Sequence, residues 1–395
     1  MQIDLSKLYP LQFLMSFMLV IQTTVSFTVF GFLQPISYLS LGLTILGFLF
    51  MSGLWMRRHE MTRFGLLVLI YYFLFLMFTF VHGTDIKNGI YRTMEGLFML
   101  MLFSYYRDNL KYILFGAAIA FSLCIYFNLG LMILFPDWMF AAEDTGDAFI
   151  LGGNYNQMGG RMLAGIVVNL LCVRYTRKWI INVVGLFLAS IIELALVGSM
   201  TSLSCVILFA VFCLVPFKVF QRVGIIGFFI FYLFFHFFVV FQGEGLHNNE
   251  TAVYIIEDVL GKDITFTNRT TLWAAALEKF GESPIIGYGN VDADWYLTQM
   301  SSFAIGPHNF ICSVLITGGI TLMLLFIVIF LASAGKIYAV NTRASNQILF
   351  GLLAFLFILT MEVYPLWFVF LLLAICYYYP DIQSQTEKKN EPVEQ

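Results

Sequence analysis

Arg269 and His308 are the two residues whose types and positions in this sequence favour chemistry over packing. Arg269 lies in "TNRTTLWAAALEKFGES" (267–283), in the first turn of an expected short amphipathic helix. A cation there opposes the helix dipole, so helix stability does not explain the residue. The free N–H groups of the turn and a forked guanidinium would together bind an anion such as phosphate. An exposed arginine paired with a nearby carboxylate is the alternative.

His308 lies in "GPHNFICSVLITGGI" (306–320), directly before a long apolar run. Because it follows Pro307, we expect it in the first turn of a helix, where the positive end of the dipole keeps the imidazole neutral. A neutral imidazole can accept the proton of an alcohol, as a general base must. A histidine tolerated at a membrane interface is the alternative.

The composition defines the elements that must position these residues. Hydrophobic residues make up 60% of the 395, and 11% are charged, against roughly a quarter in soluble domains. The predicted fold class is all-α, a polytopic transmembrane helical bundle of about 12 spans with a small extracytoplasmic loop domain. The expected spans lie near 11–33, 36–56, 64–82, 90–105, 111–135, 155–173, 179–198, 200–216, 223–241, 310–333, 347–362 and 365–380.

Basic residues give the expected orientation. With the N-terminus inside, 15 of the 21 Lys and Arg residues fall on the inner side, so the positive-inside rule predicts a cytoplasmic N-terminus and C-terminus. The first helix is expected to remain, because no signal-peptide cleavage site is evident. The predicted organisation is helices 1–9 in 1–241 with an external loop at 136–160, an extracytoplasmic loop at 242–309, helices 10–12 in 310–380 and a disordered cytoplasmic tail at 381–395.

Further polar residues are expected at the membrane. Glu193 and Glu362 lie within or near the outer ends of apolar segments, where a carboxylate is functional or a hydrogen-bonded structural group, and both interpretations stay open. The six cysteines fall in or beside apolar runs without a C-x-x-C, so neither disulfides nor a metal site are expected. No cofactor and no nucleic acid are expected either.

Five segments, read in order, carry a family resemblance: "GGNYNQMGGRMLAGI", "LVGSMTSLSCVILF", "NRTTLWAAALEKFGESPIIGYG", "GPHNFICSVLITGGI" and "LTMEVYPLWFVFLLLA". Together they resemble the family of O-antigen ligases and O-antigen or capsular polysaccharide repeat-unit polymerases. The resemblance implies a multi-pass glycosyltransferase of the bacterial cytoplasmic (inner) membrane. It would act at the outer face of that membrane on undecaprenyl-diphosphate-linked oligosaccharides, as donor and acceptor.

The resemblance also implies roles for particular residues. Arg269 and His308 match the catalytic loop arginine and histidine of the family. The substrate-binding residues implied are Arg161, Asn154, Asn156, Trp273, Gly287, Gly289 and Asn309. One departure is that many members carry Ser-Arg at the outer end of a helix, where this chain reads Ser199-Met200-Thr201. If two arginines bind the diphosphate, Arg161 would have to be the second one. The alternative interpretation is that Arg161 is an arginine whose side chain snorkels from a helix end.

The function expected first is a metal-independent repeat-unit polymerase for O-antigen or capsule. It would transfer a glycan from its lipid diphosphate to a hydroxyl of another lipid-linked unit. An O-antigen ligase using lipid A-core or another surface acceptor is the alternative, and a saccharide flippase or transporter is the alternative of another class. Besides the lipid bilayer, the partners to consider are a chain-length regulator and a flippase.

The orientation can be tested at Ser302, in the loop expected outside. We predict that Ser302→Cys reacts with a membrane-impermeant maleimide on intact or outer-membrane-permeabilised cells, because the basic residues keep this loop out of the cytoplasm. Mass spectrometry of the purified protein measures the labelling. Labelling exclusively from the cytoplasmic side would reverse the topology.

Overall fold

The computed structural model describes residues 9–27, 33–57, 61–137, 139, 149–153, 155–248, 254 and 268–388. Within these residues the chain is built of α-helices joined by short turns, and the β pairing is limited to two isolated bridges. Among the described helices, seven are long and apolar enough to cross a membrane. The predicted fold class, an all-α polytopic membrane protein, is therefore confirmed.

Each segment expected to span the membrane overlaps one helix. The helices are α1 Tyr9–Thr24, α2 Gln34–Arg57, α3 Arg63–His82, α4 Ile86–Tyr105, α5 Lys111–Leu134, α7 Met158–Cys172, α8 Ile180–Leu196, α9 Met200–Leu214, α10 Lys218–Phe235, α14 Phe310–Val340, α15 Arg343–Ile358 and α16 Leu366–Lys388. Helices α9 and α15 are apolar but shorter than the candidate spans.

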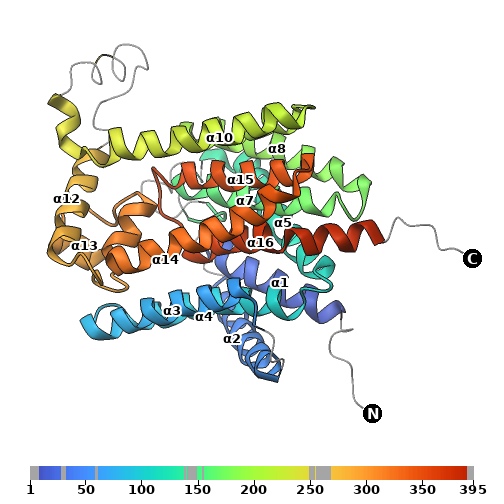
Figure 1. Ribbon diagram of the computed structural model, residues 1–395, viewed down its shortest axis with the longest axis horizontal. Coiled ribbons are helices and arrows are strands. Elements are labelled where there is room, and N and C mark those ends of the chain that lie inside the picture. The colour runs from blue at the N-terminus through green and yellow to red at the C-terminus, as the bar shows by residue number, and fades with distance from the viewer. Residues whose placement is uncertain are drawn as a thin grey trace, which may run out of the picture.

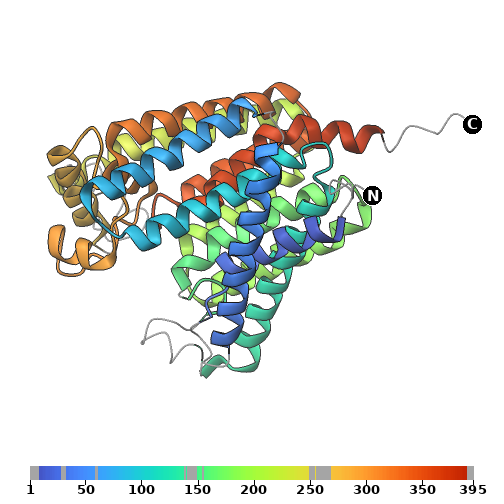
Figure 2. The same ribbon diagram turned by 90° about the horizontal axis from the view of Figure 1, so that it is seen from below.

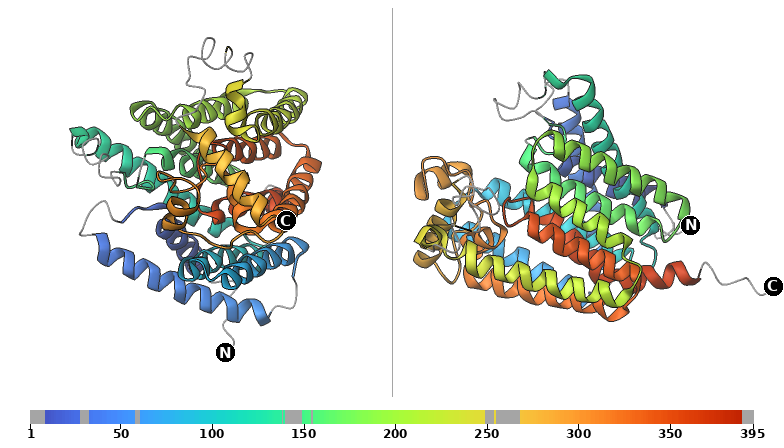
Figure 3. Two further views of the ribbon diagram at one scale, coloured as in Figure 1. Left: turned by 90° about the vertical axis from the view of Figure 1, so that its left-hand side faces the viewer. Right: turned by 90° about the horizontal axis from the view of Figure 1, so that it is seen from above.

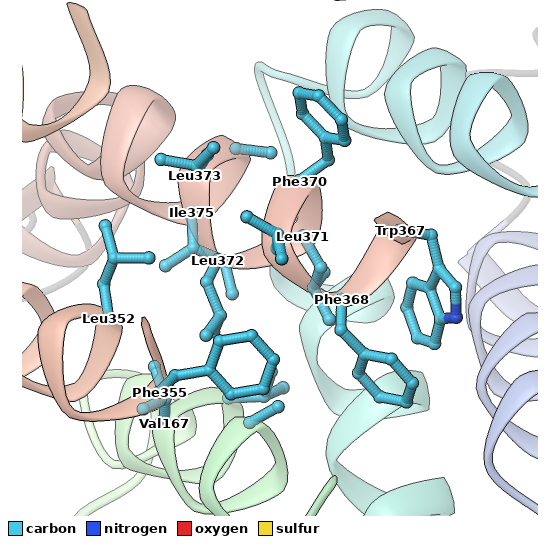
Figure 4. Packing of buried hydrophobic residues seen from close by; sticks show 14 of the residues in the cluster. Val167, Leu352, Phe355, Trp367, Phe368, Phe370, Leu371, Leu372, Leu373 and Ile375 are labelled. Atoms are coloured by element: carbon cyan, nitrogen blue, oxygen red, sulfur yellow. The ribbon is translucent and has the colours of Figure 1, made fainter. Parts of the chain in front are cut away.

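Helix α16 forms the centre of the bundle. It contacts α14, α4, α15 and α7, and Figure 1 shows it running between the helices of the two outer layers. Figure 4 shows Leu372 and Phe368 of α16 packed beside Phe355 of α15 and Val167 of α7, all of which are buried. Helix α2 runs crosswise to α3 and α14, as Figure 2 shows. The central helix thus fixes the positions of α7 and α15, which carry parts of the site.

Two short helices, α12 Arg269–Glu282 and α13 Ala293–Gln299, lie across one end of the bundle (Figure 3). We call residues 268–309 the cap, and it lies opposite the C-terminal end of α16. Leu272, Trp273 and Ala276 of α12 are buried against Ile316 of α14. The apolar face expected for this amphipathic helix therefore packs on the bundle, which leaves its N-terminus at a fixed place.

The cap is locked into a break in α14. Gly319 has φ 57° and ψ −156° inside that helix, and such a break frees backbone groups that a membrane protein must satisfy internally. Residues 284–289 satisfy them. The bonds run from Tyr288 N–H to Ile316 O (2.7 Å), Gly289 N–H to Thr317 O (2.9 Å), Ile320 N–H to Pro284 O (2.8 Å) and Thr321 N–H to Ile285 O (3.3 Å).

The glycines of "GYG" are required by this interlock. Gly287 and Gly289 have φ of 60° and 73°, values that only glycine adopts freely. A Cβ on Gly287 would lie 2.3 Å from Ile316 O, and one on Gly289 would lie 2.4 Å from the Thr79 Cα. Both glycines thus allow the cap backbone to contact α14 and α3 directly, and their substrate-binding role stays a prediction.

The tail differs from its prediction. Residues 381–388 were expected to be disordered, but α16 continues through Pro380 to Lys388. The side-chain amide of Gln385 donates to Arg107 O at 2.7 Å and accepts from Leu110 N–H at 3.1 Å. These two bonds hold the last turns of α16 against the turn before α5. The polar composition of the tail gives no sign of such a contact. Residues 389–395 lie outside the described residues.

The interlock predicts that Gly287→Ala is destabilising. The added methyl group meets Ile316 O and the backbone must keep a positive φ, so we expect a loss of about 2–3 kcal/mol in the free energy of unfolding. A lower Tm of the detergent-solubilised protein measures the effect. Gly281→Ala is the matched control, since no atom lies within 4 Å of its added Cβ. Equal Tm values for the two variants would contradict the interlock.

Candidate functional site

A cavity of ≈ 520 Å³ lies where the cap meets the bundle. Residues from five parts of the chain line it. These parts are the short helix η3 (Tyr155–Gln157), the start of α9, the start of α12, the end of the cap and the end of α15. The lining residues are Tyr155, Asn156, Gly198, Ser199, Met200, Thr201, Ser202, Asn268, Arg269, Leu272, Phe303, His308, Ile358, Met361 and Glu362. Both residues expected to be catalytic therefore face one space.

Arg269 is the first residue of α12, after Asn268, which holds a left-handed conformation with φ 64°. The Arg269 Nε donates to Met361 O at 2.9 Å, and the guanidinium forms a hydrogen-bonded ion pair with Glu362. The arginine is thus paired with a carboxylate, as the alternative interpretation proposed, but in a cavity and not on an open surface. Its side chain is 19% exposed.

His308 lies outside the helix in which it was expected. Helix α14 begins at Phe310, and the Asn309 side chain caps it by accepting from Cys312 N–H at 3.1 Å. The expectation of a first-turn histidine is wrong because Asn309 takes the cap position. His308 itself has φ 43°, a conformation that costs energy for a residue with a Cβ and is concentrated at functional sites.

Glu362 joins the two residues. One carboxylate oxygen contacts Arg269, and the other lies 3.1 Å from His308 Nδ1. A carboxylate only accepts hydrogen bonds, so this contact assigns the proton to Nδ1 and leaves Nε2 able to accept one. The orientation of the His308 ring is therefore provided by a side chain and not by a helix dipole. The sequence signal was an acidic residue near the end of an apolar segment, and it left the role of Glu362 open.

The other residues expected to bind substrate divide into three groups. Asn156 lines the cavity, whereas Asn154 lies outside the described residues. Trp273 and Asn309 are fully buried and do not line the cavity. In the structure Trp273 packs the cap on the bundle and Asn309 caps α14, and their contact with substrate stays a prediction.

Arg161 does not line the cavity either. Its side chain is buried, donates to Gln157 O at 2.6 Å and lies over the Tyr364 ring, 5.4 Å from the centroid. Its expected role as a second phosphate ligand is therefore not supported by its position. Gly152 packs against the guanidinium, so the loop before α7 closes over Arg161.

The cavity wall contains the first turn of α9 instead. Met200, Thr201 and Ser202 begin this helix, and Ser199 at its N-cap makes no side-chain cap bond. The first N–H groups of a helix have no partner within it and carry the positive end of the dipole. The position where many family members have arginine therefore presents a helix N-terminus to the cavity.

The described residues hold no group of three or more His, Cys, Asp or Glu side chains that could bind a metal ion. What the cavity combines is a guanidinium, a helix N-terminus and a carboxylate-oriented imidazole. This set can bind an anion and accept a proton.

The fold and the site define an integral membrane protein with a polar, buried Arg–Glu–His site beneath a helical cap. Residues 155–327 match the model of a family described as O-antigen ligase. The match confirms the resemblance to the O-antigen ligase family and supports a membrane enzyme of surface polysaccharide biosynthesis. It includes Arg269 and His308 and ends before Glu362. No match was found among curated proteins.

Glu362→Gln tests whether the carboxylate matters to the chemistry. The amide keeps a similar shape but loses the charge that pairs with Arg269 and orients His308, so we expect glycan transfer to fall at least about 100-fold. Surface polysaccharide in a complemented deletion strain measures transfer.

Glu193→Gln is the matched control for this change. Glu193 is equally a buried carboxylate of the bundle, but it bonds to Asn128 and does not line the cavity. We expect its activity to remain within about threefold. Full activity of Glu362→Gln at normal protein level would show that the bridge is structural.

Proposed function

We propose that the protein is a repeat-unit polymerase. It transfers a glycan from an undecaprenyl-diphosphate carrier to a hydroxyl of another lipid-linked unit, at the outer face of the bacterial cytoplasmic membrane. The observation that carries this proposal is the Glu362 bridge, which places Arg269 and His308 side by side in one cavity. The family match supports the same chemistry.

The reaction requires a base and an anion site. The acceptor hydroxyl attacks the anomeric carbon, His308 Nε2 takes the hydroxyl proton, and the bond from that carbon to the diphosphate oxygen breaks. The lipid diphosphate leaves with the electron pair and one additional negative charge, and the anomeric centre is inverted. Arg269 lies where it can stabilise that charge within the cavity.

The second contact to the diphosphate comes from α9 in this proposal. Its first-turn residues Met200, Thr201 and Ser202 line the same cavity as Arg269. A helix N-terminus and a guanidinium are complementary anion ligands, one fixed in the backbone and the other forked. The chain therefore does not need Arg161 for this purpose.

An O-antigen ligase is the second candidate, since the matching family carries that description. The two reactions share donor, base and phosphate site and differ in the acceptor. A transporter is less well supported, because its substrate site would lie near the bilayer midplane between repeats, whereas this cavity lies under the cap at one end of the bundle. A chain-length regulator and a flippase remain predicted partners.

We expect His308→Ala and Arg269→Ala each to abolish the polysaccharide ladder in a complemented deletion strain. One removes the base and the other the cation, and losing a positioned acid–base group costs about 10²–10⁴ in rate. The controls are His82→Ala, an exposed histidine at the end of α3, and Lys279→Ala, on the same helix as Arg269. A normal ladder from well-expressed His308→Ala would refute the proposed base.

An assay with the purified protein distinguishes polymerase activity from ligase activity. Undecaprenyl-diphosphate-linked repeat units are supplied alone, and the lipid-linked products are resolved by gel or mass spectrometry. Longer lipid-linked glycans identify a polymerase. Product formed exclusively after lipid A-core is added identifies a ligase.

A further inference from the structure

A buried histidine, His236, lies beside Asn309, the N-cap residue of α14. It begins the π turn η5 (His236–Val240), which continues α10, and its side chain is 4% exposed. Its Nε2 lies 3.4 Å from Asn309 Nδ2, and its Nδ1 lies 3.0 Å from Tyr232 O. It does not line the cavity. Single π turns in helices occur frequently at functional sites.

The hydrogen bonds determine where the His236 proton is. The Asn309 Oδ1 accepts from Cys312 N–H at 3.1 Å, so the other end of this amide, Nδ2, must face His236. An amide nitrogen only donates, and therefore Nε2 of His236 must accept. The proton lies on Nδ1, which donates to Tyr232 O. His236 is thus held as a neutral ring that accepts a hydrogen bond at Nε2 and donates one at Nδ1.

Asn309 connects His236 to the turn that carries Glu362. Its Nδ2 also donates to Thr360 O at 3.1 Å, and the next residue, Phe310, donates its N–H to Leu359 O at 2.9 Å. These bonds join the start of α14 to the turn that follows α15, which carries Glu362. His308 directly precedes Asn309 and has a strained φ of 43°, so it is joined to a residue whose side chain is held by several bonds.

Packing alone does not explain a histidine here. It stands in "FYLFFHFFVVF" (231–241), a segment in which phenylalanine fills most neighbouring positions. A ring packed against Tyr232, with the two centroids 4.4 Å apart, could equally be phenylalanine. Burying a polar ring is costly unless its nitrogens are bonded, so the bonds to Asn309 and Tyr232 are the feature that histidine adds.

We propose that His236 is a positioning residue for transfer: its Nε2 fixes the Asn309 amide, and Asn309 holds His308 in its strained conformation beside Glu362. This inference rests on the proposed role of His308 as base. It requires that loss of the Nε2 acceptor lowers kcat while the KM for the lipid-linked donor stays unchanged, since His236 does not touch the cavity.

The test compares His236→Phe with His236→Gln in the purified full-length protein, using lipid-linked repeat units. Phenylalanine keeps the ring on Tyr232 and removes the acceptor, whereas glutamine can place its Oε1 near the position of Nε2. We expect His236→Phe to lower kcat about 10-fold to 100-fold, the range typical of a misplaced catalytic group. His236→Gln should recover most of the activity, with KM within about twofold in both. His82→Phe, at an exposed site, is the matched control.

A double substitution gives the decisive readout. In an Asn309→Ala background, His236→Phe should change kcat less than about twofold, because the bond it removes is already absent. Additive losses, an unrescued glutamine variant, or wild-type kcat in His236→Phe would each overturn the inference. His308→Ala is assayed in parallel, because its activity reports on the proposed function separately. An inactive His308→Ala together with a fully active His236→Phe refutes the positioning role alone.

Discussion

The turn that follows α15 is the constraint on which the site depends. Three successive carbonyls there bind groups from elsewhere: Leu359 accepts from Phe310 N–H, Thr360 from the Asn309 amide and Met361 from Arg269 Nε. The next side chain, Glu362, then reaches both Arg269 and His308. Backbone carbonyls near the end of a helix need partners. Here Arg269 and Asn309 of the cap and Phe310 of α14 supply them. The same bonds that satisfy the backbone therefore bring Arg269 and His308 to Glu362.

The cap can be held so firmly because α14 is broken. A continuous helix would use its own carbonyls and N–H groups, and the cap could then contact it through side chains alone. The break at Gly319 offers backbone groups to residues 284–289, which pair with them directly. Since α12 precedes this loop and α13 follows it, these bonds tie the middle of the cap to α14. Arg269 and His308, near its two ends, meet through Glu362.

Charge in the site is distributed over backbone and side chains. Glu362 balances the charge of Arg269, which lowers the penalty of holding a guanidinium in a partly buried cavity. The first turn of α9 adds positive potential without another cation. An arginine at Met200 would add a further charge to this wall.

The sequence by itself determined the fold class and the segments that form the helices, because long apolar runs have few alternatives in a bilayer. It also identified Arg269 and His308, since each was a polar residue beside an apolar helix whose type packing did not explain. Tertiary structure decided the rest. Glu362 is 54 residues from His308 in the chain, and its role follows from a contact that no local pattern encodes. Arg161, Trp273 and Asn309 have suitable residue types for substrate contact, but packing buries them away from the cavity. Local sequence specifies which groups are available, whereas helix packing specifies which of them reach the same space.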